Sequence, residues 1–171
     1  MAMTAADVVE ILDRLDGAGI DAWLDGGWAV DALLGEETRP HDDLDLIVRV
    51  DAVAAMRDAL AAAGFRLVRG EPISNFVLRD PHGREVDAHP VTFDQTGDGI
   101  YRMESGEDWR YPAEGFGGRG RIERREVRCL TADVQMLCHS VGYKPAETDF
   151  HDMRLLNARF GTRLLPPYGP S

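Results

Sequence analysis

The fold of this chain is decided by the stretch Asp42-Asp43-Leu44-Asp45-Leu46-Ile47-Val48. Side chains in a strand point to alternate faces, so Asp43 and Asp45 share one face and the apolar residues after each of them share the other. Two unit charges about 4 Å apart repel by roughly 4 kcal/mol at an effective dielectric constant near 20, so a cation or a shared proton stabilises such a pair. Oxygen ligands of this kind suit Mg²⁺. Isolated pairs of this kind are also common in ordinary strands, so context must decide.

A strand and a pair of glycines precede this stretch. The apolar run 20–24 predicts a strand, and Gly26-Gly27 then predicts a tight turn into a helix over 28–34 that Gly35 ends. The free N–H groups and the dipole of a helix N-terminus favour a triphosphate at such a position. On their own the glycines are explained as simply by an ordinary turn. Neither a Walker loop nor a Rossmann glycine fingerprint is present.

A third carboxylate follows in a predicted hairpin. Phe76 to Arg79 and Glu85 to Val91 flank the turn-rich residues 80–83, which suit antiparallel pairing and make the sheet mixed. Asp87 joins the other two carboxylates if its strand neighbours theirs. Three carboxylates can hold one or two metal ions around a phosphoryl group, and Asp87 can also accept the proton of an attacking hydroxyl.

The rest of the chain completes an α+β fold, a mixed β-sheet with helices packed on it. The glycine-rich segment 97–120 predicts irregular structure with short strands. The chain has 171 residues, 44% of them hydrophobic, so we expect one structural domain, with residues 1–130 as the core and 131–171 as a helical C-terminal extension packed on it. The other predicted elements are a helix that begins at Thr4, a helix over 52–63 capped by Asp51, a strand over 65–69, a hairpin over 121–130, and helices over 131–141 and 148–160.

Charge and hydrophobicity exclude several classes of partner. The net charge of −11 argues against binding of a phosphate backbone, so no nucleic acid is expected. No stretch approaches the roughly 20 apolar residues of a membrane span, and the start of the chain lacks a signal core, so we expect a cytoplasmic protein with no membrane partner. Cys129 and Cys138 are expected as reduced, buried thiols. The basic cluster, which acids interrupt and which favours a solvated hairpin over an RNA site, comprises Arg119, Arg121, Arg124, Arg125 and Arg128.

Six segments together carry a family resemblance: 24–33, 38–46, 86–90, 126–129, 139–143 and 149–155. They resemble the antibiotic nucleotidyltransferases, namely the lincosamide nucleotidyltransferases and the aminoglycoside 2″-adenylyltransferases. The resemblance covers most of the chain, and its C-terminal part is more similar to the lincosamide enzymes. It implies a polymerase-β-like nucleotidyltransferase core, with ATP or another nucleoside triphosphate as co-substrate.

The resemblance also implies roles for the carboxylates and the glycines. Asp43 and Asp45 would bind Mg²⁺, with Asp87 as the third metal-binding carboxylate and the catalytic base. Gly26 and Gly27 would hold the phosphates.

Two basic residues match positions beside the nucleotide in this family. Arg39 and His41 would help to offset the charge of the triphosphate. A solvated loop explains these two residues equally well.

The acceptor site is less clearly marked. Tyr101 and Trp109, with Tyr111, can form an aromatic wall for an acceptor, or can equally cap the core. His139 and Tyr143 match a family segment and are further acceptor-binding candidates, although a histidine beside apolar neighbours is more often structural.

These observations predict a Mg²⁺-dependent enzyme that transfers a nucleoside monophosphate, expected to be AMP, to a hydroxyl of a small antibiotic. A lincosamide-like acceptor is favoured over an aminoglycoside, and the surplus of acids suits a cationic acceptor. Two alternatives stay open: a protein or tRNA acceptor, as in antitoxin-type nucleotidyltransferases, and a nucleotide-binding module without turnover. The sequence leaves homodimerisation open.

Overall fold

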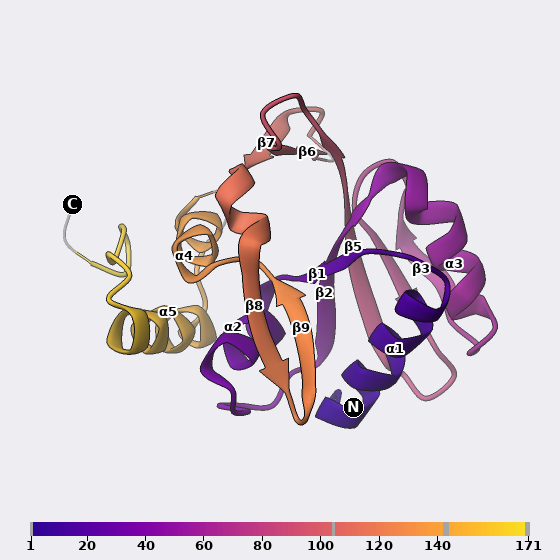
Figure 1. Ribbon diagram of the computed structural model, residues 1–171, viewed down its shortest axis with the longest axis horizontal. Helices are drawn as coiled ribbons and strands as arrows, with labels where there is room; N and C mark the ends of the chain where they lie inside the picture. The colour runs from indigo at the N-terminus through magenta and orange to yellow at the C-terminus, as the bar shows by residue number, and fades with distance from the viewer. Residues whose placement is uncertain (1, 104, 142–143, 170–171) are drawn as a thin grey trace.

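A computed structural model describes residues 2–103, 105–141 and 144–169. Its strands are β1 (Ala22–Leu24), β2 (Asp43–Arg49), β3 (Arg66–Gly70), β4 (Phe76–Arg79), β5 (Glu85–Phe93), β6 (Gly99–Arg102), β7 (Asp108–Tyr111), β8 (Gly118–Ile122) and β9 (Arg125–Cys129). Within these residues they form one sheet of nine strands in the order β3-β4-β5-β2-β1-β9-β8, from which β6 and β7 continue beside β5 (Figure 1). The β2–β5 and β1–β9 pairs are parallel and the others antiparallel, which confirms the mixed sheet and the α+β class.

The helices are α1 (Ala5–Gly17), α2 (Gly26–Leu34), α3 (Val53–Ala61), α4 (Ala132–Ser140) and α5 (Glu147–Phe160), with 3-10 turns η1 (Val50–Ala52) and η2 (Ala113–Gly117). Thr4 caps α1 as predicted, through a reciprocal capping box with Asp7. The prediction that Asp51 caps α3 is wrong. Asp51 lies within η1 and pairs with Arg49 at 2.9 Å, so α3 begins without a side-chain cap.

The apolar face of β2 and β5 forms the centre of the main core. Leu44, Leu46 and Val48 are fully buried and belong to the same cluster as the apolar residues of α1 and α3. Burial of each such side chain contributes about 1.5–3 kcal/mol. Because alternate residues point away from this core, β2 and β5 present their acidic residues on the opposite face.

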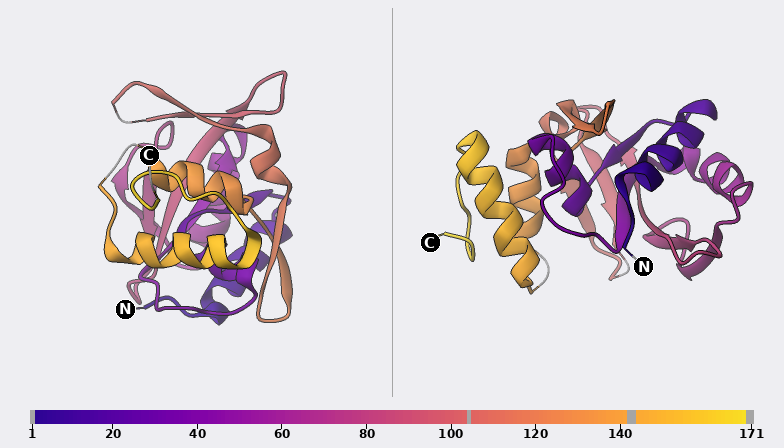
Figure 2. Two further views of the ribbon diagram at one scale, coloured as in Figure 1. Left: turned by 90° about the vertical axis from the view of Figure 1, so that its left-hand side faces the viewer. Right: turned by 90° about the horizontal axis from the view of Figure 1, so that it is seen from below.

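The C-terminal helices pack on α2. Val30 of α2 lies in a second apolar cluster with Met136 of α4, Met153 and Leu156 of α5, and Tyr168. In both views of Figure 2, α4 and α5 lie side by side at one end of the molecule. The division of the chain at residue 130 stays a prediction.

The segment 97–120 contains short strands, as predicted, but is more regular than predicted. The β6–β7 hairpin projects from the end of β5, at the top of Figure 1 and of the left view in Figure 2. Gly120 lies so close to the backbone of Ala32 that a side chain there would collide with it, which allows α2 to pack on β8. The glycines therefore serve close packing here, whereas their density in the sequence suggested irregular structure.

Two further predictions concern membrane-spanning helices and the thiols. No helix among the described residues is long and apolar enough to cross a membrane. Both cysteines are free, and Cys129 is buried while Cys138 is only partly buried.

Candidate active site

The predicted carboxylates meet on the face of the sheet that lies opposite the main core. The parallel register of β2 and β5 sets Asp45 directly opposite Asp87. Ligand atoms of Asp45, Asp87 and His89 lie within 4.8 Å of one another. Asp43 is the next residue on the same face of β2 and is more exposed. The structure thus brings Asp45 and Asp87 together as the alternation predicts, and it adds His89.

Like charges are crowded in this carboxylate cluster. Burial, followed by the neighbouring charge of Asp43, raises the pKa of Asp45 to about 8. Burial and the charge of Asp87 also raise the pKa of Asp43. One carboxylate oxygen of Asp87, Oδ1, is buried without a hydrogen-bond partner. Crowded carboxylates with an unpaired buried oxygen form a donor set that fits a divalent cation such as Mg²⁺.

A buried ion-pair chain connects this cluster with α2. Asp25 caps the helix, because its Oδ1 accepts a hydrogen bond from the Gly26 N–H at 2.8 Å. His89 Nδ1 lies 3.9 Å from Asp25 Oδ2, and His89 Nε2 lies 3.5 Å from Asp87 Oδ1. Burial would lower the pKa of His89, but the carboxylates of Asp25 and Asp87 outweigh it and raise this pKa to about 10. His89 is therefore a cation held between the helix cap and the carboxylate cluster.

The two glycines are the first residues of α2, so the helix begins at Gly26 and not at Trp28 as predicted. Gly26 has a φ of +60°, and a side chain there would collide with the carboxylate of Asp45. A side chain at Gly27 would collide with His41 and Arg39. The glycines thus allow the helix N-terminus to approach both the acidic cluster and two basic residues.

Arg39 and His41 are anchored, and the solvated-loop interpretation of them is wrong. His41 is buried and its Nε2 lies 2.5 Å from Asp31 Oδ2. Asp31 also accepts a hydrogen bond from the Thr38 hydroxyl at 2.6 Å. Arg39 binds Asp152 of α5 with two nitrogens. Buried acids on two helices therefore hold both side chains beside the N-terminus of α2.

One pocket of about 580 Å³ collects these groups. Among the sequence-predicted site residues, those that line it are Gly26, Gly27, Arg39, His41, Asp43, Asp45, Tyr101, Trp109 and His139. Asp87 adjoins the pocket through its contacts with the other acids, and Tyr143 lies outside the described residues. The further lining residues are Asp25, His89, Met103, Glu107, Tyr111, Cys138, Val141 and Asp149.

The aromatic residues divide between the lining of the pocket and the apolar core. The Tyr101 ring lies over His89, with the ring centroids 5.5 Å apart, and Trp109 also lines the pocket. Tyr111 is buried in the apolar cluster beneath them, and burial raises the pKa of its hydroxyl well above the ordinary value. His139 donates from Nδ1 to the Gln135 carbonyl at 2.8 Å and also lines the pocket.

Comparison with known proteins agrees with this geometry. The profile of the aminoglycoside-2″-adenylyltransferase family matches residues 7–156. The chain belongs to this family. A lincosamide resistance protein of Staphylococcus haemolyticus is 26% identical to this family member over 156 residues, which cover 91% of the chain and 96% of the relative.

Solved structures support the same assignment. The crystal structure of a lincosamide antibiotic adenylyltransferase with bound lincomycin has a TM-score of 0.81 at 26% identity, covering 92% of this chain and 99% of that one. ANT(2″)-Ia in complex with adenylyl-2″-tobramycin has a TM-score of 0.71 at 21% identity, covering 90% and 87%, and shows the shared fold. The predicted nucleotidyltransferase fold is confirmed, and this member of the aminoglycoside-2″-adenylyltransferase family is a nucleotidyltransferase.

Sequence reasoning missed two residues of the site in this family member. His89 lies two positions after Asp87 in the same strand, so the alternation that selected Asp87 also places His89 on the site face. Asp25 directly precedes the glycine pair, where an acid is a favoured helix cap. Both signals were present in the sequence.

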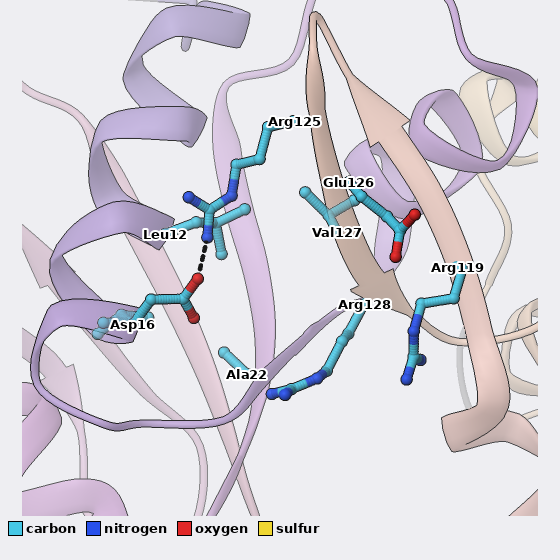
Figure 3. Close-up of a pocket in the computed structure, with 9 residues that line it drawn as sticks. Leu12, Asp16, Ala22, Arg119, Arg125, Glu126, Val127 and Arg128 are labelled. Atoms are coloured by element: carbon cyan, nitrogen blue, oxygen red, sulfur yellow. Dashed lines mark hydrogen bonds and ion pairs between the residues drawn. The ribbon is translucent and has the colours of Figure 1, made fainter.

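Three arginines of the basic cluster, Arg119, Arg125 and Arg128, line a separate cavity of about 280 Å³ that shares no lining residue with the larger pocket (Figure 3). Arg125 pairs there with Asp16 and Asp13 of α1, and Arg128 pairs with Asp21. These acids offset much of the positive charge, which agrees with a hairpin face stabilised by ion pairs.

Proposed function

We propose that this chain transfers AMP from Mg²⁺–ATP to a hydroxyl of a small antibiotic, with a lincosamide-like acceptor favoured over an aminoglycoside. The observation that carries the proposal is the position of the Asp45–Asp87 pair beside the N-terminus of α2, where Asp45 lines the pocket and Asp87 adjoins it. The favoured acceptor class rests on the lincosamide relative, which matches this chain over 96% of its own length.

Asp43, Asp45 and Asp87 would hold the cation. When bound, Mg²⁺ would neutralise these carboxylates and polarise the phosphoryl group that is transferred. His89 supplies a positive charge beside Asp87, and Asp25 lies next to the other ring nitrogen of His89. Asp25 thereby ties the orientation of the acidic cluster to the start of α2.

The nucleotide phosphates would bind at the N-terminus of α2. The first-turn N–H groups and the helix dipole favour anions there, and Arg39 adds positive charge at the same place, next to the ring of His41. Since neither glycine has a side chain, the phosphates can approach the backbone closely.

The acceptor hydroxyl would attack the α-phosphorus in line with the bond to the leaving pyrophosphate. A new O–P bond forms, the bond to the bridging oxygen breaks, and the carboxylate of Asp87 accepts the hydroxyl proton. Tyr101 and Trp109 would form the wall against which the acceptor binds, and Glu107 and Asp149 would face a cationic amine. The reaction would take place in the cytoplasm, where ATP is available.

Pyrophosphate release and product mass test this proposal directly. Purified protein is incubated with Mg²⁺, each of the four nucleoside triphosphates, and a panel of lincosamides and aminoglycosides. We expect an adenylylated lincosamide. If none of the panel compounds leads to pyrophosphate release, while Mg²⁺–ATP still raises the melting temperature, the antibiotic acceptor is rejected and the nucleotide site is kept. Neither release nor stabilisation with any nucleotide would reject the function.

A further inference from the structure

Arg39 is held by a buried acid that comes from the C-terminal helix. Arg39 lies between α2 and β2, and its Nε and Nη2 donate to Oδ1 and Oδ2 of Asp152 at 3.0 and 2.7 Å. The side chain of Asp152 is 2% exposed and that of Arg39 is 22% exposed. A two-pronged pair of this kind fixes the plane of the guanidinium as well as its position.

The guanidinium fixed in this way lies against the first turn of α2. A Cβ atom added at Gly27 would lie only 2.5 Å from Nη2 of Arg39. Nη1 donates to the Pro40 carbonyl at 3.2 Å. Arginine has five N–H donors, and these contacts use one on Nε, one on Nη1 and one on Nη2. Within the described residues, two donors therefore remain for an anion, one on Nη1 and one on Nη2, and Arg39 lines the pocket beside the helix N-terminus.

The acids around Arg39 differ in how strongly they act on its guanidinium. The hydrogen bond with Asp152 is the main cause that raises the pKa of Arg39, and Asp31 and Asp149 contribute through charge alone. Asp31 is occupied by His41 and Thr38. Asp152 is thus the acid that sets the direction of the guanidinium.

We propose that Asp152 is a positioning residue for the nucleotide, holding Arg39 so that its two remaining donors face the phosphates. This inference rests on the proposed function. Through this contact α5 is part of the nucleotide site, and a side chain more than a hundred residues away in sequence determines how Arg39 meets a triphosphate. A merely structural salt bridge would stabilise the fold without any effect on phosphate affinity.

A second arginine with a buried acid partner provides the control, and it differs in that Arg84 also donates to Asp7 and Glu10. Arg84 donates from Nε to Asp80 Oδ2 at 2.7 Å, and the exposed fractions of their side chains are 14% and 0%. Neither residue lines the large pocket. Asp80→Asn therefore removes an equally buried partner of an arginine, and it should lower stability without any change in phosphate binding.

The experiment compares Asp152→Asn with Asp80→Asn, using inorganic tripolyphosphate as the binding probe in calorimetry and ATP in steady-state kinetics. For Asp152→Asn we expect tripolyphosphate affinity to fall about tenfold or more and KM for ATP to rise by a similar factor. KM for the acceptor should change less than about twofold, and Asp152→Glu, which retains the charge, should recover part of the affinity. In an Arg39→Met background, Asp152→Asn should have no additional effect on affinity.

Each outcome decides between the two proposals. If the wild type binds tripolyphosphate and turns over, but Asp152→Asn lowers affinity no more than Asp80→Asn does, the inference is wrong and the proposed function stands. If the wild type neither binds nor turns over, the proposed function itself fails. If Asp152→Asn does not fold, the double variant Arg39→Met/Asp152→Leu removes both charges and should bind as weakly as Arg39→Met alone. Affinity equal to that of the wild type in this double variant would overturn the inference.

Discussion

Asp45 of β2 and Asp87 of β5 lie directly opposite each other in a parallel pair, with His89 beside them. This pairing joins two carboxylates whose residues are 42 positions apart in the sequence. Burial and charge repulsion at Asp45 oppose folding of the metal-free protein, and the same features create a strong demand for a cation.

Replacement of Asp45 by Asn should therefore separate stability from activity. The amide retains the shape and removes one of the crowded charges, so metal-free Asp45→Asn should be more stable than the wild type by on the order of 1–3 kcal/mol near pH 8. Transfer should fall by at least about a hundredfold, because a metal ligand is lost. Denaturant unfolding and pyrophosphate release measure the two effects. Full activity in this variant would reject Asp45 as a ligand.

The stability of the metal-free protein should fall as pH rises. The pKa of Asp45 is about 8 in the folded protein against 3.8 as its ordinary value, so the folded state binds this proton more tightly. That contribution is complete below pH 4 and is lost as pH rises through 8. The pKa of His89, raised from 6.5 to about 10, has the same sign, and its contribution is lost as pH rises through 10.

Magnesium should reverse this trend, because it binds the deprotonated carboxylates. The increase in melting temperature on addition of Mg²⁺ should therefore grow between pH 6 and 9. Melting curves over this range, with and without Mg²⁺, measure the effect. Asp45→Asn is the control, and the stability of this metal-free variant should retain only the pH dependence that is due to His89. A stabilisation by Mg²⁺ that is independent of pH would contradict the raised pKa of Asp45.

The sequence could predict the parts of the site that depend on local pattern. Alternation in β2 and β5 placed Asp43, Asp45 and Asp87 on one face, and the hairpin turn at 80–83 placed β4 beside β5. The capping box at Thr4 is likewise a local signal. These predictions are confirmed as geometry, while the roles of the residues in binding and catalysis stay predictions.

The features of the fold and the site that the sequence did not predict depend on contacts that no local sequence pattern indicates. Arg39 and Asp152 are 113 residues apart, and nothing near Arg39 in the sequence indicates its partner. Asp51 looked like a helix cap because an alanine-rich run follows, but a 3-10 turn displaced the start of α3. The glycines of 97–120 resembled loop glycines, whereas Gly99 and Gly120 allow close packing on Phe116 and Ala32.

Gly26 offers a test of the close approach between α2 and the carboxylates. Gly26→Ala puts a methyl group against Asp45 at a φ of +60°, so it should abolish stabilisation by Mg²⁺–ATP. Gly35 is the matched control, because it also has a positive φ, +78°, but no atom lies within 4 Å of an added Cβ. Gly35→Ala should cost about 1 kcal/mol and retain nucleotide binding. Equal loss of binding in both variants would show that helix stability alone matters at Gly26.

The aromatic wall should control the acceptor and not the nucleotide. Trp109 lines the pocket from the β6–β7 hairpin, whereas Gly26 and Gly27 line it from the N-terminus of α2. Trp109→Ala removes a large apolar surface, so KM for the acceptor should rise about tenfold while KM for ATP changes less than about twofold. Trp23 is the control, because it contacts Phe93 and Phe116 and does not line the pocket. Trp23→Ala should lower stability by about 3 kcal/mol and leave both KM values unchanged.

The comparison of Trp109→Ala with Trp23→Ala also tests the role of the β6–β7 hairpin. If Trp109→Ala raises both KM values equally, the hairpin would act on the whole pocket and the assignment of separate acceptor and nucleotide ends would be wrong. If only the acceptor KM changes, the short β6–β7 hairpin sets acceptor specificity on the core of β2, β5 and α2. Lincosamides of different side-chain size should then respond differently to Trp109→Ala, because the wall they contact has been removed.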